Sequence, residues 1–104
     1  MTAAASAAAQ AHALRAAAAF LEDAGAAGLS VTADGDGSLV IRVPAGAGTP
    51  AARAAAVTAL AAVIGAPAPH RTVSGDCAWI ASAGTLAGHP ARVTTHIDAR
   101  EQHA

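Results

Sequence analysis

The chain has 104 residues, the usual size of one domain, and a net charge of −1, which leaves no basic field to attract nucleic acid or anionic lipid. The single cysteine excludes an intramolecular disulfide, so we expect a cytoplasmic protein. The hydrophobic fraction of 54% overstates the core, because about a third of the chain is Ala and only one Phe and one Trp are present. Every basic residue is Arg, and the abundance of Ala, Gly and Arg is typical of a GC-rich coding bias rather than of a function. This composition predicts a small soluble domain with a thin core, whose isolated fold is either marginally stable or buries further surface against a partner.

The first predicted element is a helix over residues 3–24, a segment made mostly of Ala, the residue with the highest helix propensity. Gly25 follows as a C-terminal stop. Gln10, His12 and Arg15 interrupt the apolar run, and no basic segment precedes it. We therefore expect neither a signal peptide nor a membrane span.

The middle of the chain predicts a hairpin followed by a second helix. Residues 29–33 alternate between apolar and polar side chains, and residues 38–43 are rich in β-branched ones. The Asp-Gly-Asp-Gly run at 34–37, between them, has the chemistry of a turn. Thr49 has the features of a helix N-cap, with proline following at the first helical position, and a helix is expected over residues 50–64.

The last third of the chain predicts three strands, over residues 70–74, 77–83 and 91–97. Gly84 is expected to kink the middle strand before a two-residue turn at Gly88 and His89. Successive side chains of a strand alternate between its two faces, so Trp79 and Ile80 cannot both point inward. We expect Trp79 to lie in the core beneath the helices.

The resulting order of elements is α-β-β-α-β-β-β. Two helices with one apolar face each are most simply placed on one face of an antiparallel sheet, which predicts an α+β fold built as a two-layer sandwich. Residues 1–97 are expected to form a single domain, and residues 98–104 a frayed tail. The opposite face of the sheet is left open, to water or to a partner.

The segment before the second helix carries the pattern G-x-G-x-x-A, which is typical of dinucleotide-binding loops. Such a loop needs an acidic residue about twenty positions further on to hold the ribose, whereas His70 and Arg71 stand there. A strand end followed by a helix start accounts for the same residues, so no cofactor is predicted. A looser anion site at this helix N-terminus stays as a hypothesis, with the candidate residues Gly46, Gly48, Thr49 and Arg53.

No catalytic or metal-binding signature is present in the sequence. The five histidines include no HExxH spacing, and the single cysteine lies in an apolar strand, where a thiol is usually a small buried hydrophobe. Asp34 and Asp36 could begin a calcium loop, but Ala45 stands where the closing carboxylate would be needed. We therefore predict no enzyme, no metal and no cofactor.

The leading functional hypothesis is a non-enzymatic protein–protein interaction or accessory module that self-associates, most simply as a twofold dimer. The alternative is a small regulatory or nucleic-acid-associated protein that uses Arg and His side chains on the open sheet face, although the net charge disfavours nucleic acid. Weak anion or ligand binding at the start of the second helix comes third. The interaction residues expected on the open face are Val40, Arg42, Ile80, Arg92 and His96.

Overall fold

The structure is a computed structural model that describes residues 3–24 and 28–98. Its elements are α1 (Ala3–Ala24), β1 (Ser30–Ala33), β2 (Leu39–Arg42), the 3-10 turn η1 (Ala45–Ala47), α2 (Pro50–Val63), β3 (His70–Ser74), β4 (Cys77–Leu86) and β5 (His89–Ile97). The α+β class and the order α-β-β-α-β-β-β predicted from the sequence are therefore confirmed. Within the described ranges, neither helix is long and apolar enough to cross a membrane.

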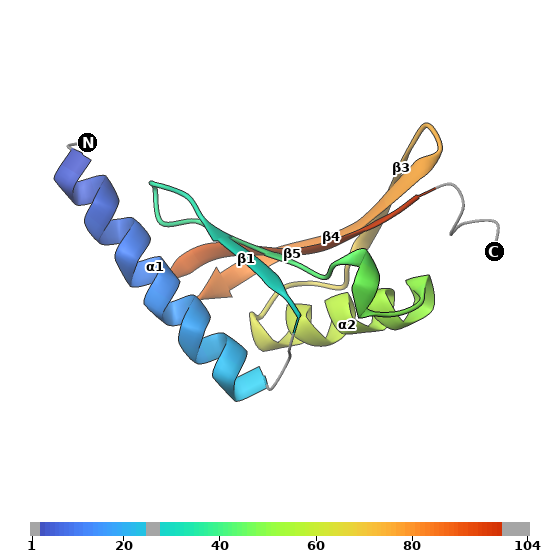
Figure 1. Cartoon of the computed structure of the whole chain (residues 1–104), viewed down its shortest axis with the longest axis horizontal. Coiled ribbons are helices and arrows are strands. Elements are labelled where there is room, and N and C mark those ends of the chain that lie inside the picture. Colours follow the sequence, from blue (N-terminus) through green and yellow to red (C-terminus); the bar gives the residue numbers. More distant parts are fainter. Residues whose placement is uncertain (1–2, 25–27, 99–104) are drawn as a thin grey trace.

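The five strands form one sheet in the order β1-β2-β5-β4-β3, and both helices lie against the same face of it (Figure 1). We call the face without helices the open sheet face. Neighbouring strands are antiparallel except β2 and β5, which pair in parallel, so the sheet is mixed and not wholly antiparallel as predicted. The reason is the crossover through α2, which returns the chain so that β3 runs in the same direction as β2. Two successive hairpins then make β5 parallel to β2 as well.

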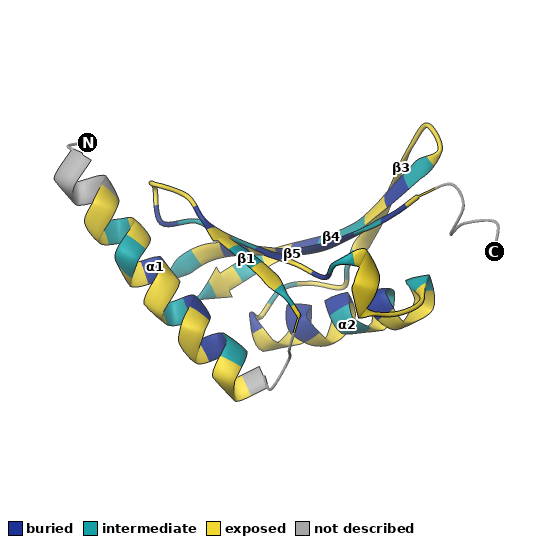
Figure 2. Ribbon diagram, viewed as in Figure 1, coloured by how far each residue is buried: buried dark blue, intermediate teal, exposed yellow. Residues whose placement is uncertain are grey.

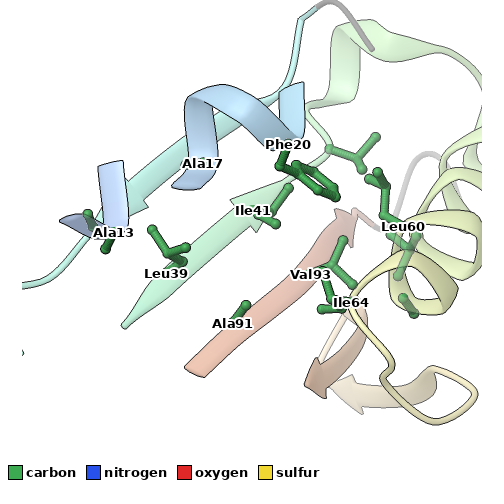
Figure 3. Close-up of a cluster of buried hydrophobic side chains, with 13 residues drawn as sticks. Ala13, Ala17, Phe20, Leu39, Ile41, Leu60, Ile64, Ala91 and Val93 are labelled. Atoms are coloured by element: carbon green, nitrogen blue, oxygen red, sulfur yellow. The ribbon is translucent and has the colours of Figure 1, made fainter. Parts of the chain in front are cut away.

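The core lies between the sheet and the helices, where buried residues are concentrated, while the outer sides of both helices are exposed (Figure 2). Among the described side chains of α1, Phe20 is the one large side chain fully buried in this core; the other buried residues are alanines, and Leu21 packs against the core partly buried. Figure 3 shows Phe20 directed toward the aliphatic side chains of the sheet and of α2. The buried aliphatic side chains of β2, α2 and β5 in this cluster include Leu39, Ile41, Val57, Leu60 and Val93.

The prediction that Trp79 lies in the core is wrong. Its side chain is 39% exposed on the open sheet face, whereas Ile80 packs against the core. The physical reason is the space beneath β4. A Cβ atom added to Gly84 would lie 2.5 Å from the carbonyl oxygen of Ile64, so the chain leaving α2 passes directly against this face of the strand. Because Gly84 must lie on this face, alternation along β4 places Ile80 on the same face and Trp79 on the other one.

The turn between β4 and β5 also differs from the prediction by one residue. Ala87 and Gly88 form the turn, with φ values of 51° and 84°. Positive φ at both central residues is what a two-residue hairpin turn requires to match the twist of its strands. Strand β4 runs through Gly84 without ending there. The predicted stop at Gly25 and most of the predicted tail, residues 99–104, lie outside the described residues.

Candidate binding surface on the open sheet face

The open sheet face gathers side chains from three adjacent central strands. On β2 and β5, Leu39, Ile41 and Val93 point into the core, so the residues that alternate with them point to the open side. The pairing then places Trp79 of β4 directly opposite His96 of β5. We call the following group the open-face cluster: Arg42, Trp79, Arg92, Thr94 and His96.

The aromatic part of the cluster is the contact between Trp79 and His96. Their ring centroids are 4.5 Å apart and the ring planes are tilted by 50°. Offset and tilted arrangements are the favourable geometries for such rings, so each ring limits the other's orientation. The rest of the indole faces solvent, because 39% of the residue remains exposed. A large apolar surface is therefore held in place near the start of β4, next to the edge strand β3.

Two shallow hollows meet at Arg42 and Trp79. The first, of about 300 Å³, lies beside the segment that follows β2 and is lined by Arg42, Val43, Pro44, Ala45, Trp79 and His96. The second, of about 360 Å³, lies over the strands and is lined by Arg42, Thr72, Trp79, Ala81, Arg92 and Thr94. Each is large enough for one or two side chains of a partner. Both hollows are open to solvent.

The charged side chains at the strand positions of this surface are arginines, and Asp98 follows directly after β5. Arg42 and Arg92 are both exposed, and no carboxylate stands at a strand position on this face of the described sheet. Asp34, just beyond the end of β1, lines a separate hollow with Arg92 at the rim. A guanidinium is a planar donor that matches the two oxygens of a carboxylate or phosphate. The centre of the surface therefore suits a ligand with acidic groups next to an apolar one.

The five interaction residues predicted from the sequence are not all on one face. Val40, Arg42, Arg92 and His96 share the open sheet face as expected, whereas Ile80 lies on the helix-covered face. The sequence analysis missed Trp79 as a member of this surface. Gly84 carried a usable signal, because it shares a face with Ile80 and a glycine within a strand often marks the close approach of another backbone.

The candidate anion residues lie close together at the start of α2, but their polar groups are directed elsewhere. The hydroxyl of Thr49 accepts a hydrogen bond from the backbone N–H of Ala52 at 3.1 Å, the N-cap that the sequence predicted. Arg53 is fully buried, and its guanidinium donates to the carbonyl oxygen of Ala45 at 3.1 Å. Gly46 and Gly48 shape the turn in between. Through this hydrogen bond the guanidinium of Arg53 holds the loop before α2 in place.

In the described part of the chain, no group of three or more His, Cys, Asp or Glu side chains is placed to hold a metal ion. Cys77 is half-buried at the start of β4. The carboxyl of Asp36, at the tip of the β1–β2 hairpin, accepts hydrogen bonds from the hydroxyl and the backbone N–H of Ser38, and these hold the pKa of Asp36 below its ordinary value. That contact fixes the hairpin turn.

Comparison of the chain with protein-family models, with curated proteins and with solved structures gives no match. The fold and the surface nevertheless define a class of protein. It is a two-layer α+β domain whose uncovered sheet face presents an aromatic side chain together with two arginines.

Proposed function

We propose that the protein is a small non-enzymatic binding module whose open sheet face receives an acidic segment of another protein. The observation that supports this most directly is the position of Trp79. The chain has one tryptophan, and it lies exposed beside Arg42 instead of filling a thin core. Tryptophan and arginine are the residues that most often dominate the binding energy of protein interfaces.

The chemistry of the cluster selects the kind of segment. Carboxylates of the partner would be held by Arg42 and Arg92, and an aliphatic or aromatic side chain next to them would cover the exposed side of Trp79. Thr94 lines the same hollow as both arginines. Nucleic acid is a poorer match, since phosphate contacts need many cationic groups, and the net charge of the chain is −1.

The test selects peptides from a random displayed library and measures their binding by fluorescence. Trp79 is the sole tryptophan, so the intrinsic emission of the protein reports directly on this surface. We expect selected peptides to be rich in Asp and Glu, to shift that emission, and to bind at least tenfold more weakly to Arg42→Gln. The matched control is Arg15→Gln, which removes the same charge from the exposed surface of α1 and should leave binding unchanged.

Two results would contradict the proposal. Selected peptides without acidic residues would show that the arginines do not recognise carboxylates. Binding of a single-stranded oligonucleotide that weakens steeply with salt, with no peptide selected, would favour the nucleic-acid alternative.

Self-association is a second candidate, and a separate observation favours it. On the helix side a hollow of about 300 Å³ between α1 and the end of α2 is lined by Phe20, Val63 and Leu86, and Val63 is 63% exposed. We propose that two copies meet there and not through their open faces. Two open faces brought together would place Arg42 and Arg92 of one copy against those of the other, which costs free energy.

A further inference from the structure

Two histidines from distant parts of the chain face each other at the edge of the molecule. The Nδ1 atom of His12, on α1, lies 2.5 Å from the Nε2 atom of His89, the first residue of β5. Their ring centroids are 4.7 Å apart and the rings are tilted by 44°. The two residues are 77 positions apart in the sequence, which is why no local spacing motif reveals them.

The surroundings hold the ring of His89 in this orientation. Gly37, in the β1–β2 hairpin, lies against its other side, where an added Cβ atom would be 3.3 Å from Nδ1 of His89. The same Cβ atom would lie 3.5 Å from Ala9 of α1, so hairpin and helix close around the imidazole. His89 is half-buried, whereas His12 is exposed and its ring can adjust. One nitrogen donor is therefore fixed, and the second is adjustable.

We propose that His12 and His89 together bind a divalent transition-metal ion, with Zn²⁺ as the reference ion, through Nδ1 of His12 and Nε2 of His89. In the metal-free pair, one of the facing nitrogens carries a proton and the other accepts it in a hydrogen bond. A metal replaces that shared proton and takes a lone pair from each ring. When both rings are neutral, the proton moves to the other nitrogen of its own ring, and when one ring is an imidazolium, its extra proton is released to solvent.

The geometry needs little adjustment. Tetrahedral zinc bound to two imidazoles at ~2.0–2.1 Å separates the two nitrogen atoms by about 3.3 Å. The present separation of 2.5 Å must therefore open by under about 1 Å. Rotation of the exposed His12 side chain supplies a movement of this size. Water completes the coordination, since the described part of the chain offers no third ligand in this group.

The metal would join the first half of α1 to β5. Among the described side chains of this half, the one buried in the core is Ala13, while Phe20 lies two turns further on. The polar ties are the His12 contact and the amide of Gln10, which donates to the carbonyl oxygen of Ala33 at 2.8 Å. The contact between the rings of His12 and His89 already joins α1 to β5 without a metal. The metal is therefore an exchangeable ligand that stabilises the folded protein when it binds.

The test uses tag-free protein, freed of metal with a chelator and dialysed, then titrated with ZnCl₂ in a calorimeter and heated in a spectropolarimeter. We expect one ion per chain and an increase in Tm of several degrees at saturation. Cu²⁺ should bind more tightly than Zn²⁺, and Mg²⁺ should produce neither heat nor a shift. His12→Ala should weaken zinc binding at least tenfold and remove the Tm increase. Its exposed position predicts that this variant keeps its fold, which the metal-free spectrum checks.

The matched controls are His70→Ala, which removes an exposed imidazole from the edge strand β3, and Cys77→Ala, which removes the thiol. Both should bind zinc as the parent chain does. Binding that persists in His12→Ala, or that disappears in either control, would place the ion elsewhere and overturn the proposal. Absence of heat and of a Tm shift in the parent chain would overturn it as well.

Discussion

The indole of Trp79 and the imidazole of His96 lie opposite each other on β4 and β5, with ring centroids 4.5 Å apart on the side of the sheet that no helix covers. A tryptophan buried under the helices would anchor the fold. On the open sheet face it serves binding instead. Its substitution should therefore remove binding, whereas substitution of a buried tryptophan would unfold the domain.

Replacing Trp79 with Ala should leave the protein folded. An aromatic pair contributes ~0.5–1.5 kcal/mol beyond the area it buries, and the covered part of the indole adds an area term, so we expect a loss of unfolding free energy of ~1–3 kcal/mol, measured by urea denaturation. Truncation of a fully buried Trp would cost ~3–5 kcal/mol. A loss in that higher range would show that Trp79 supports the core. Acidic peptides selected on the parent protein should no longer bind the variant.

Phe20 is expected to behave in the opposite way. It is 4% exposed and is the one large core side chain that α1 contributes in the described cluster. Phe20→Ala should cost ~3–5 kcal/mol, which approaches the whole stability of a typical small domain. Leu14→Ala on the same helix is the control, because Leu14 is 49% exposed and its loss should change stability by no more than about 0.5 kcal/mol. Equal effects of the two substitutions would contradict this assignment of the core.

Local patterns predicted the helices and strands well because the hydrogen bonds at their ends and turns join residues that are close in the sequence. Thr49 caps α2 through the bond that an N-cap makes, and the carboxyl of Asp36 closes the hairpin tip on Ser38. The face taken by Trp79 could not be predicted in this way, since alternation fixes only that Trp79 and Ile80 differ. Tertiary packing decided it, through the close passage of Ile64 against Gly84.

The parallel pairing of β2 with β5 and the meeting of His12 with His89 were also beyond a reading of local patterns. Both join segments that are distant in the sequence and depend on the crossover through α2. The open-face residues were predicted wherever alternation alone decided them, as for Arg42 and Arg92.

Gly84 should tolerate no side chain. In Gly84→Ala the new methyl group would lie 2.5 Å from the carbonyl oxygen of Ile64 and 3.0 Å from the backbone nitrogen of Ala66, and neither can rotate away. The hydrogen bond from the N–H of Thr85 to the same carbonyl, at 3.1 Å, would be strained. We expect a loss of ~1–3 kcal/mol in thermal or urea unfolding. Gly46→Ala, where an added Cβ meets nothing within 4 Å, serves as the control and should unfold as the parent does.

The hairpin tip should respond to acid. Because hydrogen bonds from Ser38 lower the pKa of Asp36, the contact contributes fully above the ordinary carboxyl pKa and is lost as the pH falls through the lowered value. An NMR titration that follows the amide of Ser38 should show this transition. Ser38→Ala removes the hydroxyl donor, so it should move the transition to higher pH. A transition that stays in place would mean that the hydroxyl bond does not stabilise the ionised form.

Self-association is predicted to depend on the helix side of the molecule. Val63 is 63% exposed beside the hollow that Phe20 and Leu86 line, so a charged side chain there would be forced into the contact between two copies. Sedimentation at micromolar concentration should show a dimer for the parent chain and a monomer near 9.9 kDa for Val63→Glu. Val40→Glu places the same charge on the open sheet face and should leave the dimer intact.

Ala17→Glu on α1 would not test a dimer contact on the helix side. Ala17 is 3% exposed in the core, so a glutamate there would unfold the domain. Comparison of the variants Val40→Glu and Val63→Glu therefore shows through which face two copies contact each other. If Val40→Glu dissociates the dimer and Val63→Glu does not, two copies meet through their open faces despite the four arginines this brings together. That result would also remove the open sheet face as a free site for an acidic partner. A monomer for the parent chain would rule out self-association and leave that face available.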